Sequence, residues 1–155
     1  NLYEEFWRIY TKSDVLPPQY IAPESSVVKS IIGEGTEVYG EVSSSVIGSG
    51  VSIGKGAVIK NSIIMNGATI GDGAIIDKNC VIGKGSIIGR GAVICANEEK
   101  PKVLSSGLNV IGKGVHIPEG TIVERNVRIF PHVCPSDIEG NIVACGSTIY
   151  PSKEA

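Results

Sequence analysis

The chain has 155 residues with 20 glycines, 42% hydrophobic but only 5% aromatic residues, and a net charge of −2 at pH 7. This length suits one domain with a continuous core, and so small a charge implies no general attraction to nucleic acid or to a membrane surface. No apolar stretch reaches the roughly 20 residues of a membrane span, and Glu4, Glu5 and Arg8 interrupt any signal-peptide core.

Residues 1–20 precede any repeat and are expected to form a linker that ends in the extended pair Pro17-Pro18. The chain begins at Asn1 without an initiator methionine, which suggests a fragment or a processed chain. Part of this linker is too apolar for a free tail, so we expect it to pack on the following domain or on a preceding one. The side chains concerned are Phe6, Trp7, Ile9 and Tyr10.

Residues 21–133 carry a six-residue repeat. An aliphatic residue recurs at each step, a glycine or asparagine follows three positions later, and a small side chain comes next. Glycine and asparagine accept a positive φ, so each step is expected to contain a short strand and a tight corner. A β-sandwich, the alternative, would show longer alternation and irregular turn spacing.

Three steps make one triangular coil, so the predicted fold is all-β, a left-handed parallel β-helix of about six coils. The left hand is assigned from the hexapeptide pattern, because it departs from the usual right-handed crossover. Five-residue steps after Val27, Val42 and Ile59 keep the coils aligned. The first face is expected to carry Ile32, Ile47, Ile64, Ile82, Ile111 and Ile129; the second Ile21, Val38, Ile53, Ile70, Ile88 and Ile117; the third Val27, Val42, Ile59, Ile76, Ile94 and Val123.

Two further segments depart from the repeat. Residues 95–109 are expected to form an inserted loop, and loops on a rigid scaffold often carry function. Residues 134–155 lose the six-residue phase and are expected to be a capping tail over the open end of the β-helix, where strand edges would otherwise stay unpaired.

The sequence offers little for covalent chemistry. His116 is expected to point outward and His132 to occupy a corner, and a zinc site of the kind found in β-helical carbonic anhydrases needs three histidines. We therefore expect no metal site and no catalytic residue, although acyl transfer through either histidine stays open. Four cysteines, none in a C-x-x-C pair, are expected to be reduced thiols of a cytoplasmic protein: Cys80, Cys95, Cys134 and Cys145.

Several motifs point to one family. Trp7-Arg8-Ile9-Tyr10-Thr11, the pair Pro17-Pro18 before Gln19-Tyr20, the stretch SIIGEGTEVYGEVSSSVIGSGVSIGKGAVIKNSIIM and the motif IIDKNCVIGKG resemble the C-terminal domain of the glucose-1-phosphate adenylyltransferases (ADP-glucose pyrophosphorylases) of bacteria and plants. The resemblance covers roughly residues 6–130. It implies a parent enzyme that joins ATP and glucose 1-phosphate to give ADP-glucose and pyrophosphate for glycogen or starch synthesis. The catalytic domain with its Mg²⁺ would lie outside this chain, which itself needs no cofactor.

The resemblance also implies partners and a regulatory site. In that family the β-helix packs on the N-terminal catalytic domain, contributes to tetramer contacts and helps to bind anionic effectors such as sugar phosphates. Two lysines that bind activator in some members match Lys78 and Lys113, and nearby charges could add to the site: Arg90, Lys100 and Lys102. Ordinary solvated corner lysines are the alternative. Two other functions stay open, a free-standing hexapeptide acyltransferase and a structural subunit from a catalytically impaired paralogue.

Overall fold

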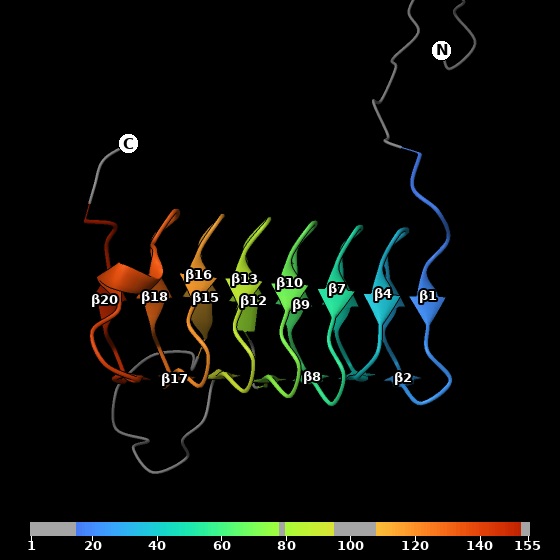
Figure 1. Ribbon diagram of the computed structural model, residues 1–155, viewed down its shortest axis with the longest axis horizontal. Coiled ribbons are helices and arrows are strands. Elements are labelled where there is room, and N and C mark those ends of the chain that lie inside the picture. The colour runs from blue at the N-terminus through green and yellow to red at the C-terminus, as the bar shows by residue number, and fades with distance from the viewer. Residues whose placement is uncertain (1–14, 78–79, 95–107, 153–155) are drawn as a thin grey trace, which may run out of the picture.

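Short parallel strands wind into a triangular prism in the computed structural model, which describes residues 15–77, 80–94 and 108–152 (Figure 1). Three parallel sheets form the three faces, named here sheets A, B and C. Sheet A contains β1 (Tyr20–Ile21), β4 (Glu37–Val38), β7 (Ser52–Ile53), β10 (Thr69–Ile70), β13 (Ile87–Ile88) and β16 (His116–Ile117).

The other two sheets each contain one strand more than sheet A. Sheet B contains β2 (Ser26–Val28), β5 (Glu41–Ser43), β8 (Val58–Lys60), β11 (Ile75–Ile76), β14 (Val93–Ile94), β17 (Ile122–Val123) and β19 (Ile142–Val143). Sheet C contains β3 (Ile31–Ile32), β6 (Val46–Ile47), β9 (Ile63–Ile64), β12 (Cys80–Ile82), β15 (Asn109–Ile111), β18 (Arg128–Ile129) and β20 (Thr148–Ile149).

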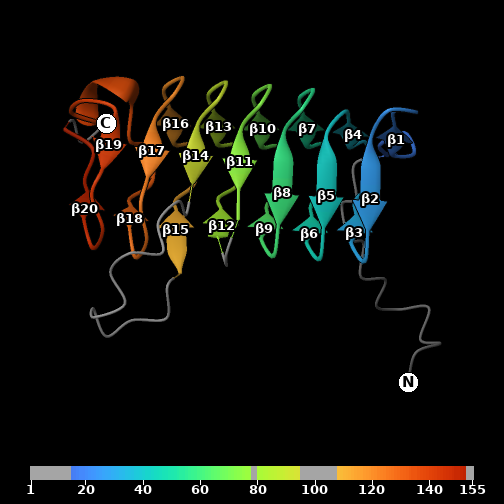
Figure 2. The same cartoon turned by 90° about the horizontal axis from the view of Figure 1, so that it is seen from below.

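The hand of the coil follows from Figures 1 and 2. In Figure 1 the chain runs down the near face through β1, then away from the viewer along the bottom face through β2, and then up the far face. It advances from right to left while it does so. That combination makes a left-handed coil, so the fold class predicted from the repeat is confirmed.

All three predicted ladders of inward side chains are confirmed, residue for residue. On sheet C, for example, Ile82 pairs with Ile64 on one side and with Ile111 on the other. From the second coil to the sixth, every inward anchor is 2% exposed or less, which places one dry aliphatic core along the axis. A residue-by-residue match of this kind follows from the period of two across each strand, which turns alternate side chains inward.

The corners show how the backbone turns three times per coil. Most six-residue steps place glycine at a positive φ, and His132 takes the same conformation at φ 64° as predicted. The three five-residue steps turn instead at Lys29, Ser44 and Asn61, each with φ 48°. Inside these tighter corners serine hydroxyls replace apolar packing: Ser45 Oγ accepts the N–H of Ser62 at 3.2 Å and donates to the carbonyl of Ser43 at 2.7 Å.

The segment after residue 133 lies at the end of the prism opposite β1 (Figure 1). It begins with a 3₁₀ turn, η1 (Pro135–Asp137), which follows β18 where a further sheet A strand would come, and it then adds β19 and β20 to the other two sheets. Of the expected loop 95–109, residues 95–107 lie outside the described residues, and Asn109 already belongs to β15.

Two smaller observations complete the fold. In the described ranges no helix has the length and apolar character needed to cross a bilayer. The expectation of reduced thiols is wrong for Cys80, which is disulfide-bonded, whereas Cys134 and Cys145 are free. Apolar neighbours in the sequence show that a cysteine is buried, but they do not show whether a second sulfur lies within bonding distance.

Candidate functional site

The outer surface of sheet C carries a continuous row of aliphatic side chains. Because alternate side chains of a strand point to opposite faces, the residue before each inward anchor points outward. These outward residues are aligned by the strand pairing, and Ile31 is 69% exposed. With strands about 4.8 Å apart, five of them form an apolar stripe about 20 Å long. We call Ile31, Val46, Ile63, Val81 and Val110 the apolar ladder.

The outer surface of sheet A is mostly polar, although its inner surface is the same as that of sheet C. Its outward row contains one aliphatic side chain, Ile87. The other members of the row are Tyr20, Glu37, Ser52, Thr69 and His116. The repeat does not by itself require an apolar exterior, since sheet A, the next face along the chain, is mostly polar outside. Sheet B resembles sheet C in turning aliphatic side chains outward, with Val58, Ile75 and Val93 in its outward row.

Lys113 lies in a corner between sheets C and A, directly after β15, and is exposed. Lys84 lies one coil earlier in the same corner, where its carbonyl accepts the N–H of Gly114 at 3.0 Å. His132 lies one coil later, its N–H donating to the carbonyl of Lys113 at 2.9 Å, and its ring lies against Gly114. We call Lys84, Lys113 and His132 the basic corner.

Arg90 lies in a different corner, between sheets A and B, so the structure does not bring it together with Lys113. The side chains stacked in this corner alternate in charge, with Asp72 one coil before Arg90 and Glu119 one coil after it. Backbone hydrogen bonds align them: Gly91 donates to the carbonyl of Asp72, and Gly120 donates to the carbonyl of Arg90. The carboxylate of Asp72 is held in place by the N–H of Lys55 at 2.9 Å. Neighbouring carboxylates offset the charge of Arg90, and this corner attracts anions less than the basic corner does.

The remaining predicted site residues, Lys78, Lys100 and Lys102, lie outside the described residues. Lys84 was not included among the site residues predicted from the sequence. The signal was present: Lys84 and Lys113 each come two residues after a first-face anchor, Ile82 and Ile111, and so share one corner in successive coils.

The two histidines are separated by their positions. His116 points outward from β16 on sheet A, and His132 lies in the basic corner. Within the part of the chain that the structure describes, no group of three or more His, Cys, Asp or Glu side chains could hold a metal ion.

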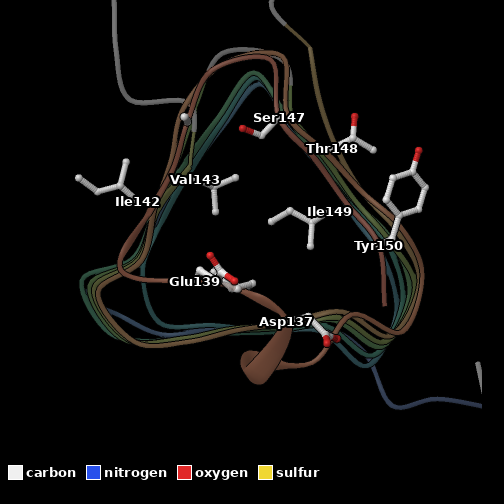
Figure 3. A pocket seen from close by; sticks show the side chains of 10 residues that line it. Asp137, Glu139, Ile142, Val143, Ser147, Thr148, Ile149 and Tyr150 are labelled. Carbon is white, nitrogen blue, oxygen red and sulfur yellow. The ribbon is translucent and has the colours of Figure 1, made fainter. Parts of the chain in front are cut away.

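The last coil borders a hollow of about 480 Å³ that is open to solvent at the end of the prism (Figure 3). Val143 and Ile149 point into it, whereas Ile142 and Tyr150 point outward. At its rim Asp137 accepts the backbone N–H groups of Ser152, at 3.1 Å, and Cys134, at 2.8 Å. The hydroxyl of Ser152 and the Cys134 N–H hold the pKa of the Asp137 carboxyl below its usual value. The hollow is the open end of the core, and its acidic rim does not favour anions.

Comparison with known proteins identifies a matching family and several similar relatives. The family model of the GMPPB C-terminal domain matches residues 41–143. A glucose-1-phosphate adenylyltransferase of Thermotoga neapolitana is 47% identical over 158 residues, which cover 99% of this chain and 37% of the relative. That of Lachnospira eligens is 72% identical over 53 residues, 34% of this chain and 12% of the relative. The chain thus spans about a third of the length of the Thermotoga relative.

Among solved structures, the acetyltransferase domain of PglB from Neisseria gonorrhoeae aligns with a TM-score of 0.46 at 20% identity, covering 86% of this chain and 57% of that chain. This likeness is too weak to bear on function.

Proposed function

Because the chain belongs to the GMPPB C-terminal domain family and is a C-terminal domain of the glucose-1-phosphate adenylyltransferase family, we propose that it serves a parent nucleotidyltransferase as a non-catalytic domain for assembly and regulation. The parent joins ATP and glucose 1-phosphate to give ADP-glucose and pyrophosphate. The domain packs on the N-terminal catalytic domain and contributes to an oligomer, a tetramer by family resemblance, in the cytoplasm.

The apolar ladder is the observation that carries this proposal. Ile31, Val46 and Ile63 keep much of their surface in water although the fold does not require apolar side chains there. Fully burying an aliphatic side chain contributes about 1.5–3 kcal/mol, so a partner that covers the stripe gains several kcal/mol. Exposed contiguous apolar patches on otherwise polar proteins mark protein–protein contacts.

The basic corner is the part of the domain that fits an anionic effector. Lys84 and Lys113 present two ammonium groups from successive coils, and the corner residues next to them in the stack, Asn66 and Pro131, carry no charge. Lysine binds phosphate as a compact charge with several donors. A sugar phosphate bound there relieves the repulsion between the two lysines, which gives the site its preference for anions.

A matched pair of substitutions in the parent protein tests the assembly role. Ile63 and Thr69 both point outward from consecutive strands, β9 at the end of the third coil and β10 at the start of the fourth. Ile63→Asp places a charge in the apolar ladder and is expected to dissociate the parent oligomer or detach the domain, measured by sedimentation velocity and ADP-glucose synthesis. Thr69→Asp is expected to leave both unchanged. Equal behaviour of the two variants would contradict the proposal.

The regulatory role is tested by titrating the parent enzyme with sugar phosphates and inorganic phosphate. A charge-assisted hydrogen bond contributes about 1.5–3 kcal/mol, so Lys113→Ala and Lys84→Ala are each expected to raise the half-activating concentration tenfold or more. Lys55→Ala, in the corner whose charges alternate, is the control and is expected to shift it little. An unchanged response in both basic-corner variants rules this site out.

A further inference from the structure

Two aromatic rings stack on the outer surface beside the basic corner. Phe130 and Tyr150 follow the inward anchors of β18 and β20, and their ring centroids are 4.5 Å apart with an interplanar angle of 24°. Both side chains are exposed, Phe130 at 42% and Tyr150 at 64%. Figure 3, which looks along the prism, shows the Tyr150 ring nearly full face, so the faces of the stacked rings are turned along the prism axis.

The stack ends at Phe130 because the two preceding positions of the same column are glycines. Gly112 and Gly83 follow the inward anchors of β15 and β12, and the strand pairing keeps the column in register. A Cβ at Gly112 would lie 2.6 Å from the backbone nitrogen of Pro131, so packing keeps this position without a side chain. The next side chain in the column is Met65, three coils before Phe130. The inner face of the Phe130 ring, which is turned toward these glycines, therefore has room for another flat ring at about the 4.8 Å spacing of the coils.

Positive charge lies beside that inner face. Lys113 follows Gly112, and its backbone is displaced from that of Phe130 by one coil, about 4.8 Å, and one residue, about 3.8 Å. Its flexible four-carbon stem lets the ammonium reach a group attached to a ring that lies on Phe130. Lys84 presents a second ammonium from the preceding coil, and Arg128 points outward from β18 two residues before Phe130.

The outer face of the Tyr150 ring is less suited to an anionic ligand. It looks out of the prism end, where Asp137 accepts the backbone N–H of Ser152 at 3.1 Å. Ser152 comes two residues after Tyr150, so a carboxylate lies near that face and repels an anion. The charges therefore direct an anionic ring to the Phe130 face.

We propose that the basic corner binds a nucleoside phosphate, with the base stacked on the Phe130 ring and the phosphate held by Lys113 and Lys84. Stacking on an aromatic side chain accepts any base, because every base has a π face. The lysine ammonium groups bind the phosphate as point charges. A sugar phosphate makes only the second set of contacts, so the corner prefers the nucleotide. This inference rests on the anion site of the proposed function and names the class of its ligand.

A matched pair of ligands isolates the contribution of the base. AMP and ribose 5-phosphate share the sugar and the phosphate, and only AMP carries a base. In isothermal titration calorimetry on the 155-residue chain, we expect AMP to bind about tenfold more tightly, because base–aromatic stacking contributes roughly that factor. Without a catalytic domain present, an ATP site of the parent enzyme does not contribute. Equal affinities overturn the inference and leave the anion site standing, whereas no binding of either ligand overturns both.

Three variants assign the contacts. Phe130→Leu is expected to lower the affinity for AMP to that for ribose 5-phosphate and to leave the latter unchanged, whereas Lys113→Ala is expected to weaken both. Tyr39→Leu is the control, because Tyr39 also follows an inward anchor but lies in the corner between sheets A and B, and it is expected to change neither affinity. A preference for AMP that survives Phe130→Leu, or that is lost equally in Tyr39→Leu, contradicts the proposal.

The NMR signals of the ligand report the stacking itself. The adenine H2 and H8 signals of AMP are expected to shift upfield when the native chain is added, because they enter the shielding region of an aromatic ring, and to shift little with Phe130→Leu. Circular dichroism checks that each variant keeps its strands, and Phe130→Met replaces Phe130→Leu if that variant unfolds. Equal upfield shifts with and without the Phe130 ring overturn the assignment of this face.

Discussion

Sheets A and C have the same interior and different exteriors. Ile53 and Ile70 on sheet A are as completely buried as Ile47 and Ile64 on sheet C, and every strand pair is parallel and in register. Outside, sheet A presents mostly polar side chains, while sheet C presents the apolar ladder. The inward half of each hexapeptide thus determines the fold, and the outward half is free to differ, so the surface that differs most is where function is to be sought.

The largest expected effects test whether the two interiors are equivalent. Ile70→Ala and Ile64→Ala each remove a fully buried side chain and leave a cavity, which costs about 2–5 kcal/mol. We expect the two variants to lose similar free energies of unfolding in urea denaturation. A loss confined to one sheet would show that the interiors are not equivalent and would break the comparison.

A smaller effect concerns two buried threonines that interrupt the interior. Thr36 Oγ1 donates to the carbonyl of Gly48 at 2.7 Å and accepts the N–H of Val51 at 3.2 Å. Thr121 Oγ1 has no partner among the described residues. Relieving an unsatisfied buried hydroxyl contributes about 1–3 kcal/mol, so Thr121→Val is expected to raise the melting temperature. Thr36→Val is expected to lower it, and a gain in both variants would contradict this account.

An exchange of outward residues sharpens the contrast between the exteriors. Ile63→Thr and Thr69→Ile each alter one exposed side chain, and we expect the free energy of unfolding to change by about 0.5 kcal/mol or less. Self-association of the chain, followed by sedimentation velocity, is expected to weaken in the first variant and to strengthen in the second. Sheet C is not the associating surface if Ile63→Thr has no effect.

The smallest effect is a pH dependence of stability at η1, which lies where a further strand of sheet A would come. Asp137 has a pKa below its usual value because Ser152 and the Cys134 N–H stabilise the carboxylate. The stability it contributes is present above about pH 3.9 and is lost as the pH falls through the lower folded pKa. Between pH 6 and pH 3 we therefore expect a smaller fall in melting temperature for Asp137→Asn than for the native chain. A fall of equal size would show that the contact is not maintained in solution.

The three ladders of inward side chains could be predicted in full, because the interior of the prism is narrow and only a few types of side chain fit at each inward position. The corners at glycine and asparagine could be predicted as well, because these residues accept a positive φ, and the place of His132 in the repeat predicted its corner. The corners at Lys29 and Ser44 could not be predicted, because other L-residues rarely adopt a positive φ. After Ile129 the phase is interrupted by the 3₁₀ turn of Pro135–Asp137. The two strands that follow it were not predicted from the sequence, although Val143 and Ile149 are six residues apart with Gly146 between them.

The candidate surfaces were predicted less completely than the fold. Lys113 was identified through a resemblance, and Lys84 was passed over although the same ladder places it beside Lys113. Arg90 was grouped with Lys113 because both lie near the inserted loop in the sequence. The structure places them in different corners, because each six-residue step moves the chain to the next corner of the triangle. Residues that are close in the sequence can therefore lie on different edges of the prism.

The pairing of β12 with β15 has a consequence for how such a protein can change. Ile82 pairs directly with Ile111 although the sequence between β14 (Val93–Ile94) and β15 (Asn109–Ile111) is longer than the other connections. Doubling the length of a flexible connection adds only about 0.6 kcal/mol of closure entropy. This junction therefore tolerates additions of almost any size, and it offers a natural splice point for grafting a new recognition element or an affinity tag.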